Sequence, residues 1–220
     1  MSKVFISPSL LSCDFGHILE EINKVESCGA EWIHYDVMDG KFVPNITFGA
    51  PVIKCVTGKH NLVNDVHLMI DRPYLYIKDF AEAGADYITI HYEACMDERE
   101  VFETLDKIHS FGKKAGISVK PKTPVDKIYK FLTSCDLVLI MTVEPGFGGQ
   151  EFDLKASGKI LRLREYLDNN DLPNVLISVD GGINDVTGKL CKDLGVDVLV
   201  AGSYIYKAKD VQERIIKLKE

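Results

Sequence analysis

The chain has 220 residues, of which 46% are hydrophobic and 27% are charged, and its formal net charge is −7. A chain of this length and composition can bury a sizeable core and is typical of soluble globular proteins. The negative charge argues against nucleic acid or an anionic membrane surface as a partner, although backbone N–H groups can still bind a small anion.

Eight apolar segments follow one another along the whole chain, separated by segments with helical spacing. The predicted strands are residues 4–10, 32–36, 62–67, 86–91, 116–120, 137–142, 175–180 and 196–201. Most of them are continuous apolar runs, which are typical of parallel strands that are buried on both faces.

Two of the intervening segments show helical signals. Residues 15–25 and 125–132 carry apolar side chains at the spacing of an α-helix. For the second helix, Thr123 is the predicted N-cap and Pro124 the predicted first residue. Elsewhere, a glycine before three of the strands is predicted to end a helix in the left-handed conformation. These glycines are Gly29, Gly84 and Gly195.

No proline- or serine-rich linker divides the chain, so we expect one domain that spans residues 1–220. Eight βα units of this combined length predict the α/β class and a single (β/α)8 TIM barrel. A doubly wound open sheet is the alternative, but the Gly-x-Gly-x-x-Gly nucleotide signature is absent after the first strand.

Residues 1–9 do not resemble a targeting signal, and no run of about 18 apolar residues could span a membrane. The six cysteines are scattered, and no two of them form a Cys-x-x-Cys pair. We therefore expect a cytoplasmic protein whose cysteines act as small buried hydrophobic residues rather than as a disulfide framework.

Four residues with metal-binding side chains stand at the ends of three predicted strands: His34, Asp36, His67 and Asp180. The carboxyl ends of barrel strands share one face, where the active site lies. Any one of these residues could be a hydrogen-bonded buried group, but four such residues at strand ends indicate a divalent-metal site. We expect one metal per subunit, with zinc favoured and Fe(II), Mn(II) or Co(II) as alternatives.

Glycine is concentrated after the last three strands, where barrels commonly bind phosphate. A single glycine pair would indicate only a tight turn, but three such clusters on successive strand ends favour a phosphate site, because glycine lets backbone N–H groups approach an anion. The residues concerned are Gly146, Phe147, Gly148, Gly149, Gly181, Gly182, Gly202 and Ser203.

Three further groups of residues near strand ends leave more than one interpretation open. Met38, Met69 and Met141 either fill irregular core space or form a dry lining above the metal. Lys120 is a solvated or paired lysine or, less favoured, a Schiff-base nucleophile. His91 and Glu93 either orient a metal ligand or form an ion pair at the rim.

The chain resembles the ribulose-phosphate 3-epimerase family in six segments that follow the family's order. They are SPSLLS at 7–12, HYDVMDGKFVPN at 34–45, DVHLM at 65–69, MTVEPGFGGQ at 141–150, VDGG at 179–182 and AGS at 201–203. The second of these segments is highly specific, whereas the last alone would mean little.

The resemblance implies a phosphate-binding barrel that interconverts D-ribulose 5-phosphate and D-xylulose 5-phosphate. It allows a homo-oligomer, either a dimer or a hexamer, and the sequence does not decide between them. It implies that His34, Asp36, His67 and Asp180 ligate the metal, and that Asp36 and Asp180 are the acid/base pair. It also implies that Ser9 and His67 contact the substrate. The glycine clusters match the family's substrate and phosphate positions, and the three methionines match residues near the reacting carbons.

Inversion of a carbon beside a ketone requires removal of a weakly acidic proton and its return on the opposite face. We hypothesise that Asp36 removes the C3 proton, that Asp180 protonates the other face, and that a metal stabilises the ene-diolate charge. The alternatives are a 3-epimerase of a hexulose 6-phosphate such as D-allulose 6-phosphate, a Schiff-base aldolase that uses Lys120, and a non-catalytic sugar-phosphate sensor.

Overall fold

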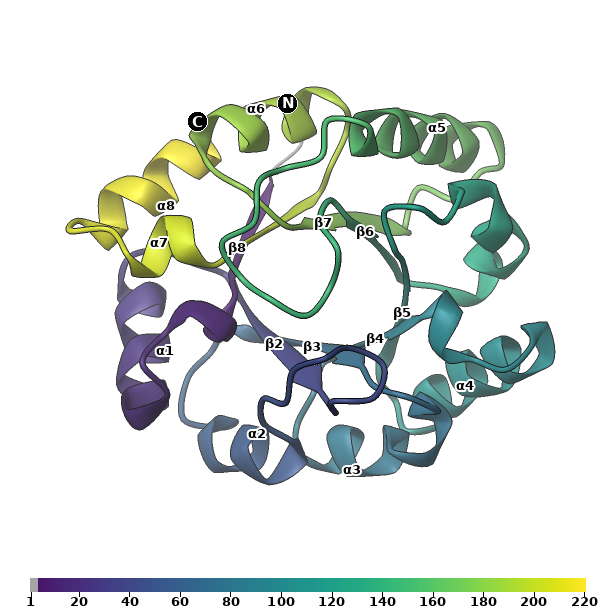
Figure 1. Ribbon diagram of the computed structural model, residues 1–220, viewed down its shortest axis with the longest axis horizontal. Coiled ribbons are helices and arrows are strands. Elements are labelled where there is room, and N and C mark those ends of the chain that lie inside the picture. Colours follow the sequence, from purple (N-terminus) through teal and green to yellow (C-terminus); the bar gives the residue numbers. More distant parts are fainter. Residues whose placement is uncertain (1–3) are drawn as a thin grey trace.

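Eight parallel strands alternate with helices in the computed structural model, which describes residues 4–220 (Figure 1). Residues 1–3, part of the N-terminal stretch predicted to carry no targeting signal, lie outside the described residues. The strands are β1 (Phe5–Pro8), β2 (Trp32–Met38), β3 (Val63–Met69), β4 (Tyr87–His91), β5 (Lys114–Val119), β6 (Leu137–Met141), β7 (Leu176–Asp180) and β8 (Val198–Ala201).

Helices follow the strands and surround them on the outside (Figure 1). The α-helices are α1 (Ile18–Ser27), α2 (Ala50–Val56), α3 (Ile77–Glu82), α4 (Glu98–Ser110), α5 (Ala156–Asn169), α6 (Asp185–Asp193), α7 (Ser203–Tyr206) and α8 (Val211–Lys219). The 3-10 helices are η1 (Leu10–Ser12), η2 (Phe15–His17), η3 (Pro73–Leu75), η4 (Tyr92–Ala94) and η5 (Val125–Ser134).

The sheet closes into a barrel. Its hydrogen-bonded order is β1-β8-β7-β6-β5-β4-β3-β2, and every one of these pairs is parallel. The two ends of this order, β1 and β2, meet through a bridge between Ser9 and His34. The predicted (β/α)8 barrel is therefore confirmed, and the carboxyl ends of all strands face the same side.

Three strands end two residues away from the predicted position, whereas the other carboxyl ends agree to within one residue. β2 and β3 each run two residues further than predicted, to Met38 and Met69, because parallel pairing between them continues to these two residues. β1 ends at Pro8, before the predicted end at residue 10. The chain leaves the strand there because Leu10–Ser12 form a 3-10 turn that is capped by the hydroxyl of Ser9.

Both predicted helices exist, but each contains 3-10 structure. Residues 15–25 begin with the 3-10 turn η2 before α1 starts, and residues 125–132 lie within the 3-10 helix η5. The predicted cap was wrong: extended Pro124 is the N-cap, and the hydroxyl of Thr123 donates a hydrogen bond to Glu93 instead. A tertiary partner has therefore replaced the local capping contact.

The glycine terminators were predicted correctly. Gly29, Gly84 and Gly195 have φ values of 97°, 100° and 88°, in the left-handed region that L-residues avoid. Each glycine reverses the chain between a helix and the following strand.

Strand alternation divides the buried apolar residues into two groups. On β6, Val138 and Ile140 belong to the large core between the sheet and the helices, whereas Leu137, Leu139 and Met141 belong to a smaller cluster. Successive side chains of a strand point to opposite faces, so the smaller cluster fills the barrel interior.

The cysteine prediction was correct only in part. All six cysteines are free, and Cys135 and Cys191 are buried. Cys55 is exposed, because it lies on the outer side of α2, whose buried residues are Ile53 and Val56. Within residues 4–220, none of the helices combines the length and the apolar character that crossing a bilayer would require.

Candidate active site

Strand alternation directs the candidate ligands into the barrel. On β2, His34 and Asp36 alternate with Tyr35, whose side chain packs in the outer core. On β3, His67 alternates in the same way with Val66. His34, Asp36 and His67 therefore point inward, where all three are almost completely buried.

The register of β2 on β3 then brings these side chains together, because it pairs Asp36 with His67. Nε2 of His34 lies 3.4 Å from Nδ1 of His67, and each of these nitrogens lies 3.4 Å from Oδ1 of Asp36. Asp180 ends β7 and completes the group, since one ligand atom from each of the four residues lies within 4.8 Å of the others.

Asp65 determines how His34 presents its ring. Nδ1 of His34 lies 2.7 Å from Oδ2 of Asp65. Because an ionised carboxylate can only accept, the Nδ1–H donates to Asp65, and Nε2 is the nitrogen that faces Asp36 and His67.

The charges of His34 and Asp36 stabilise each other. Burial by itself lowers the pKa of His34, but the carboxylates of Asp65 and Asp36 outweigh it and raise this pKa well above its ordinary value. Burial by itself raises the pKa of Asp36, but the charge and hydrogen bonds of His34 and the contact with His67 lower it below its ordinary range. Asp36 is thus held as a carboxylate, and the hydroxyl of Ser9 donates to its Oδ2 at 2.5 Å.

Asp180 and His67 are both shifted toward their uncharged forms. Burial, together with the charge of Asp36, raises the pKa of Asp180 to about 7. Burial lowers the pKa of His67 to about 4. Two neighbouring carboxyl groups whose pKa values move in opposite directions can serve as a base and an acid at neutral pH.

The donor set fits a divalent cation. Two imidazole nitrogens and two carboxylates are ligands that Zn(II), Fe(II), Mn(II) and Co(II) accept. Two unprotonated ring nitrogens that face each other at 3.4 Å would repel each other without a positive charge between them. A metal ion between the two nitrogens would relieve this repulsion, and so would a proton on the ring of His34, whose pKa is raised.

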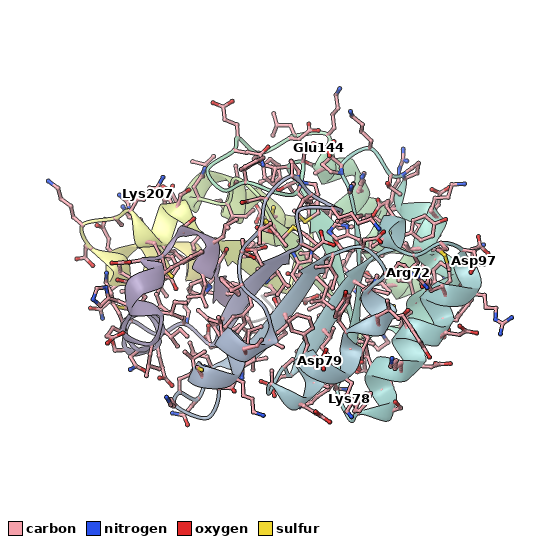
Figure 2. All side chains as sticks on the ribbon, turned by 60° about the horizontal axis from the view of Figure 1, so that its bottom comes forward. Arg72, Lys78, Asp79, Asp97, Glu144 and Lys207 are labelled. Atoms are coloured by element: carbon pink, nitrogen blue, oxygen red, sulfur yellow. The ribbon has the colours of Figure 1, made fainter. Side chains whose placement is uncertain are left out.

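A pocket opens above this cluster at the carboxyl ends of the strands. Its lining includes Ser9, Asp36 and Asp180 together with the long connection from β6 to α5. Figure 1 shows this connection crossing the barrel mouth, and Figure 2 shows the labelled Glu144 of the same connection at the top of the molecule, far from Lys78. The amide of Asn45 donates to the carbonyl of Gly146 at 2.9 Å and joins the connection to the loop after β2.

The glycine-rich loops line the same pocket. Its lining includes every predicted residue of this group, namely Gly146, Phe147, Gly148, Gly149, Gly181, Gly182, Gly202 and Ser203. At Gly182, with φ of 64°, a Cβ atom would lie 2.4 Å from the backbone nitrogen of Phe152. Only glycine allows the loop after β7 and the β6–α5 connection to approach so closely.

The three methionines also line the pocket. Met38, Met69 and Met141 are all nearly fully buried, and Met38 and Met69 are paired at the ends of β2 and β3. Their thioethers therefore form an apolar wall beside the two carboxyl groups, which favours the dry-lining interpretation.

Lys120 lies apart from this pocket. Its Nζ lies 3.9 Å from the centroid of the Phe42 ring, and Lys120 is not among the described residues that line the pocket. This cation–π contact occupies the amine and weakens the Schiff-base alternative.

Sequence reasoning missed Asp65 as a site residue, although its position two residues before His67 places it on the same face of β3. It also missed Ser12, Val143 and Gln150, which line the pocket. All three stand within the family-like segments 7–12 and 141–150, so the resemblance is the sequence signal that could have found them.

An inward-facing pair of carboxyl groups with opposite pKa shifts, set at the carboxyl end of a (β/α)8 barrel, defines a proton-transferring barrel enzyme. Residues 5–206 match the sequence model of the ribulose-phosphate 3 epimerase family. The chain therefore belongs to the ribulose-phosphate 3-epimerase family and is an enzyme of the isomerase class.

Individual relatives agree with this assignment. The chain is 44% identical to ribulose-phosphate 3-epimerase of Bacillus subtilis over 97% of both sequences. It is also 44% identical to the enzyme of that name from Synechocystis, over 98% of this chain and 93% of the relative. Among solved structures, 3-hexulose-6-phosphate synthase from Salmonella typhimurium shares the fold, with a TM-score of 0.72, 21% identity and coverage of 98% of this chain and 97% of that one.

Proposed function

We propose that this protein interconverts D-ribulose 5-phosphate and D-xylulose 5-phosphate by moving the proton on C3. The observation that carries the proposal is the meeting of Asp36 and Asp180 in one cluster with opposite pKa shifts. Epimerisation beside a ketone needs one group that is ready to accept a proton and another that is ready to donate one.

Asp36 acts as the base on ribulose 5-phosphate. Its carboxylate is ionised, and the hydroxyl of Ser9 orients Oδ2 of this carboxylate. Asp36 takes the C3 proton. Asp180 then donates its proton to the opposite face of C3, and the two residues exchange roles in the reverse direction. Each acid/base group contributes about 10²–10⁴ in rate, and the pair titrates as a unit.

His34, Asp36, His67 and Asp180 together hold one divalent cation, with zinc favoured over Fe(II), Mn(II) or Co(II). The bound cation supplies positive charge that stabilises the substrate oxygens as the C3 proton leaves. The ring of His67 also contacts the substrate, and the wall of Met38, Met69 and Met141 excludes water from the reacting carbons.

The glycine loops hold the phosphate group at the rim. Gly181-Gly182, Gly202-Ser203 and Gly146–Gly149 all line the pocket, and glycine permits backbone N–H groups to approach an anion. A negatively charged protein would in this way bind a phosphosugar without a cluster of basic side chains.

The unit that performs this chemistry is one domain of residues 1–220. The proposal is supported by the closed barrel, which uses strands from Phe5 to Ala201 and has no linker between them. We further propose that subunits of this size assemble into a homodimer or a homohexamer in the cytoplasm.

A coupled assay for xylulose 5-phosphate formation tests the proposal, run before chelation, after chelation and after metal is restored. In D2O, deuterium is expected at C3 of the product, because the returned proton comes from an acid that exchanges with solvent. Product without deuterium at C3 would contradict proton abstraction. Faster turnover of D-allulose 6-phosphate would reassign the substrate to a hexulose, and binding without turnover would indicate a sensor.

A further inference from the structure

The four candidate metal ligands His34, Asp36, His67 and Asp180 are called the metal-type cluster below. A line of hydrogen-bonding groups extends from His67 of this cluster to His91 and Glu93. Nε2 of His67 lies 2.9 Å from Nε2 of His91, and Nδ1 of His91 lies 3.3 Å from Oε2 of Glu93. His67 and His91 are fully buried, so water does not take part in the contact between the two rings. The line therefore connects a residue at the end of β4 to a candidate metal ligand on β3.

We infer that His91 and Glu93 are positioning residues that fix the tautomer of His67 and so keep its Nδ1 available to the metal. This inference rests on the proposed function, because it takes His67 as a ligand of the divalent cation. It replaces the alternative of a rim ion pair, since His91 has no exposed surface.

The assignment of protons follows from what each group can do. Glu93, as a carboxylate, can only accept, so Nδ1 of His91 must carry the proton that it donates. In a neutral His91 ring, Nε2 is then an acceptor and receives the proton that Nε2 of His67 donates. A neutral His67 with its proton on Nε2 has an unprotonated Nδ1, and this nitrogen faces His34 and Asp36.

Glu93 is itself held in place by the next βα unit. Its Oε1 accepts a hydrogen bond from the backbone N–H of Lys120 at 2.8 Å and a second one from the hydroxyl of Thr123. Both oxygens of the carboxylate therefore face donors, and neither can be replaced by an N–H group without conflict. This is also why Thr123 does not cap the helix that follows it.

The two histidines of the cluster are thus oriented in two different ways. His34 donates directly to the carboxylate of Asp65 on the neighbouring strand. His67 reaches its carboxylate only through a second imidazole, because its pairing partner on β4 is Thr89 and not an acidic residue. Groups that orient a metal ligand typically contribute a factor of about 10–100 to metal affinity.

The test is the nearly isosteric substitution Glu93→Gln. A glutamine must place its amide NH2 against either Nδ1–H of His91 or the donors of Lys120 and Thr123. If the amide oxygen keeps the latter two donors, the proton of His91 moves to Nε2 and opposes the Nε2–H of His67. We expect Zn²⁺ affinity, measured against a competing chelator, to fall by about 10–100-fold.

Glu100→Gln is the matched control. Glu100 is a buried glutamate in the adjacent helix α4, and it accepts a hydrogen bond from the backbone N–H of Met96 at 2.6 Å. Its hydrogen-bond partners Met96, Asp97 and Thr104 lie outside the line from His67 to Glu93, so its substitution should leave Zn²⁺ affinity unchanged.

A double substitution distinguishes an effect that Glu93 exerts through His91, called the relay below, from a general loss of structure. In His91→Gln no imidazole tautomer remains to be fixed, so adding Glu93→Gln should cause no further loss of Zn²⁺ affinity. If the two substitutions instead weaken Zn²⁺ binding by independent factors, Glu93 does not act through His91 and the inference is overturned.

Nitrogen-15 NMR of the histidine rings in the metal-free protein gives a readout that requires neither activity nor metal. We expect His67 to carry its proton on Nε2 in the wild type and to lose this preference in Glu93→Gln. An unchanged His67 tautomer in Glu93→Gln would overturn the relay. Failure of the wild type to bind Zn²⁺ would instead count against the proposed metal, and the relay would still be decided by this spectrum.

Discussion

Asp36 and Asp180 are the same residue type in the same buried group, and their neighbours alone make them different. Asp36 has His34, His67 and the hydroxyl of Ser9 within reach, so its charged form is favoured. Asp180 has burial and the charge of Asp36 acting on it, so its neutral form is favoured. The proposed division of acid and base roles is thus a property of the surroundings of each carboxyl group.

Replacing either carboxylic acid with its amide removes a proton-transfer group at almost constant shape. Asp36→Asn and Asp180→Asn should each lower the epimerisation rate by about 10²–10⁴. The rate is measured by the coupled xylulose 5-phosphate assay, with circular dichroism as the control for an intact fold. Near-normal turnover in either variant would remove that residue from its proposed role.

Metal binding should depend on pH, because the cation must displace protons from the cluster. The pKa of Asp180 is raised to about 7, and the pKa of His34 also lies well above its ordinary value. Zn²⁺ affinity should therefore rise with pH, by about tenfold per pH unit for each proton released, with the Asp180 contribution ending near pH 7.

Calorimetry in buffers of different ionisation enthalpy counts the released protons at pH 6 and pH 8. Asp180→Asn has no proton to release at this position, so it should release fewer protons at pH 6. Zn²⁺ binding that is independent of pH would show that the cluster is already deprotonated.

In the metal-free protein, the contribution of Asp180 to the free energy of unfolding changes with pH in the opposite direction to Zn²⁺ affinity. The pKa of Asp180 is raised on folding, so between about pH 4 and pH 7 the folded state holds a proton that the unfolded state has lost. The contribution of Asp180 to stability therefore decreases as pH rises through this window.

Among the elements, the connection from β6 to α5 depends most closely on a neighbouring loop. Gly182, with φ of 64°, lies so near Phe152 that an added Cβ atom would meet two backbone atoms at 2.4 and 2.8 Å. The loop after β7 thus supports the segment that crosses the pocket, and both of them contribute residues to its lining.

Gly182→Ala should displace the β6–α5 connection, raise the KM for the phosphosugar and lower the free energy of unfolding by about 1–3 kcal/mol. Urea unfolding and steady-state kinetics measure the two effects. The control is Gly158→Ala in α5, where a Cβ atom has nothing within 4 Å and φ is not positive. That variant should be neutral or more stable by up to about 1 kcal/mol. Equal behaviour of the two variants would contradict the role of the close approach.

For the whole molecule, the metal-type cluster joins the paired strands β2 and β3 to β7, which is not hydrogen-bonded to either of them. A cation bound by all of them binds the folded state only and therefore stabilises the entire barrel. The cluster also lies beside the join of β1 and β2, since Ser9 and His34 form the bridge between these strands.

Removing the metal should lower the melting temperature. With free Zn²⁺ at about 100 times its dissociation constant, the stabilisation is about 2.7 kcal/mol. For a protein of this size that corresponds to a shift of about 5–10 °C. Scanning calorimetry with and without chelator measures the shift, and His34→Ala should abolish its metal dependence. Equal melting temperatures in wild type with and without Zn²⁺ would argue against binding at this cluster.

Several features could be derived from local sequence because they depend on local chemistry. Apolar runs that alternate with helical segments determined the number of strands and their order along the chain. Glycines such as Gly29 and Gly84 determined where helices end. His34 and Asp36 could be assigned to one face of a strand because side-chain alternation is a property of the strand itself.

Other features were decided only when the chain folded. The register of β2 on β3 placed Asp65 against His34, and the packing of β4 beside β3 placed His91 against His67. Thr123 stands where the sequence predicts a helix cap, yet its hydroxyl donates a hydrogen bond to Glu93 instead. The sequence determined which side chains are available to the site. Their hydrogen-bond partners and protonation states depend on distances between strands, because electrostatic and hydrogen-bond energies depend steeply on separation and burial.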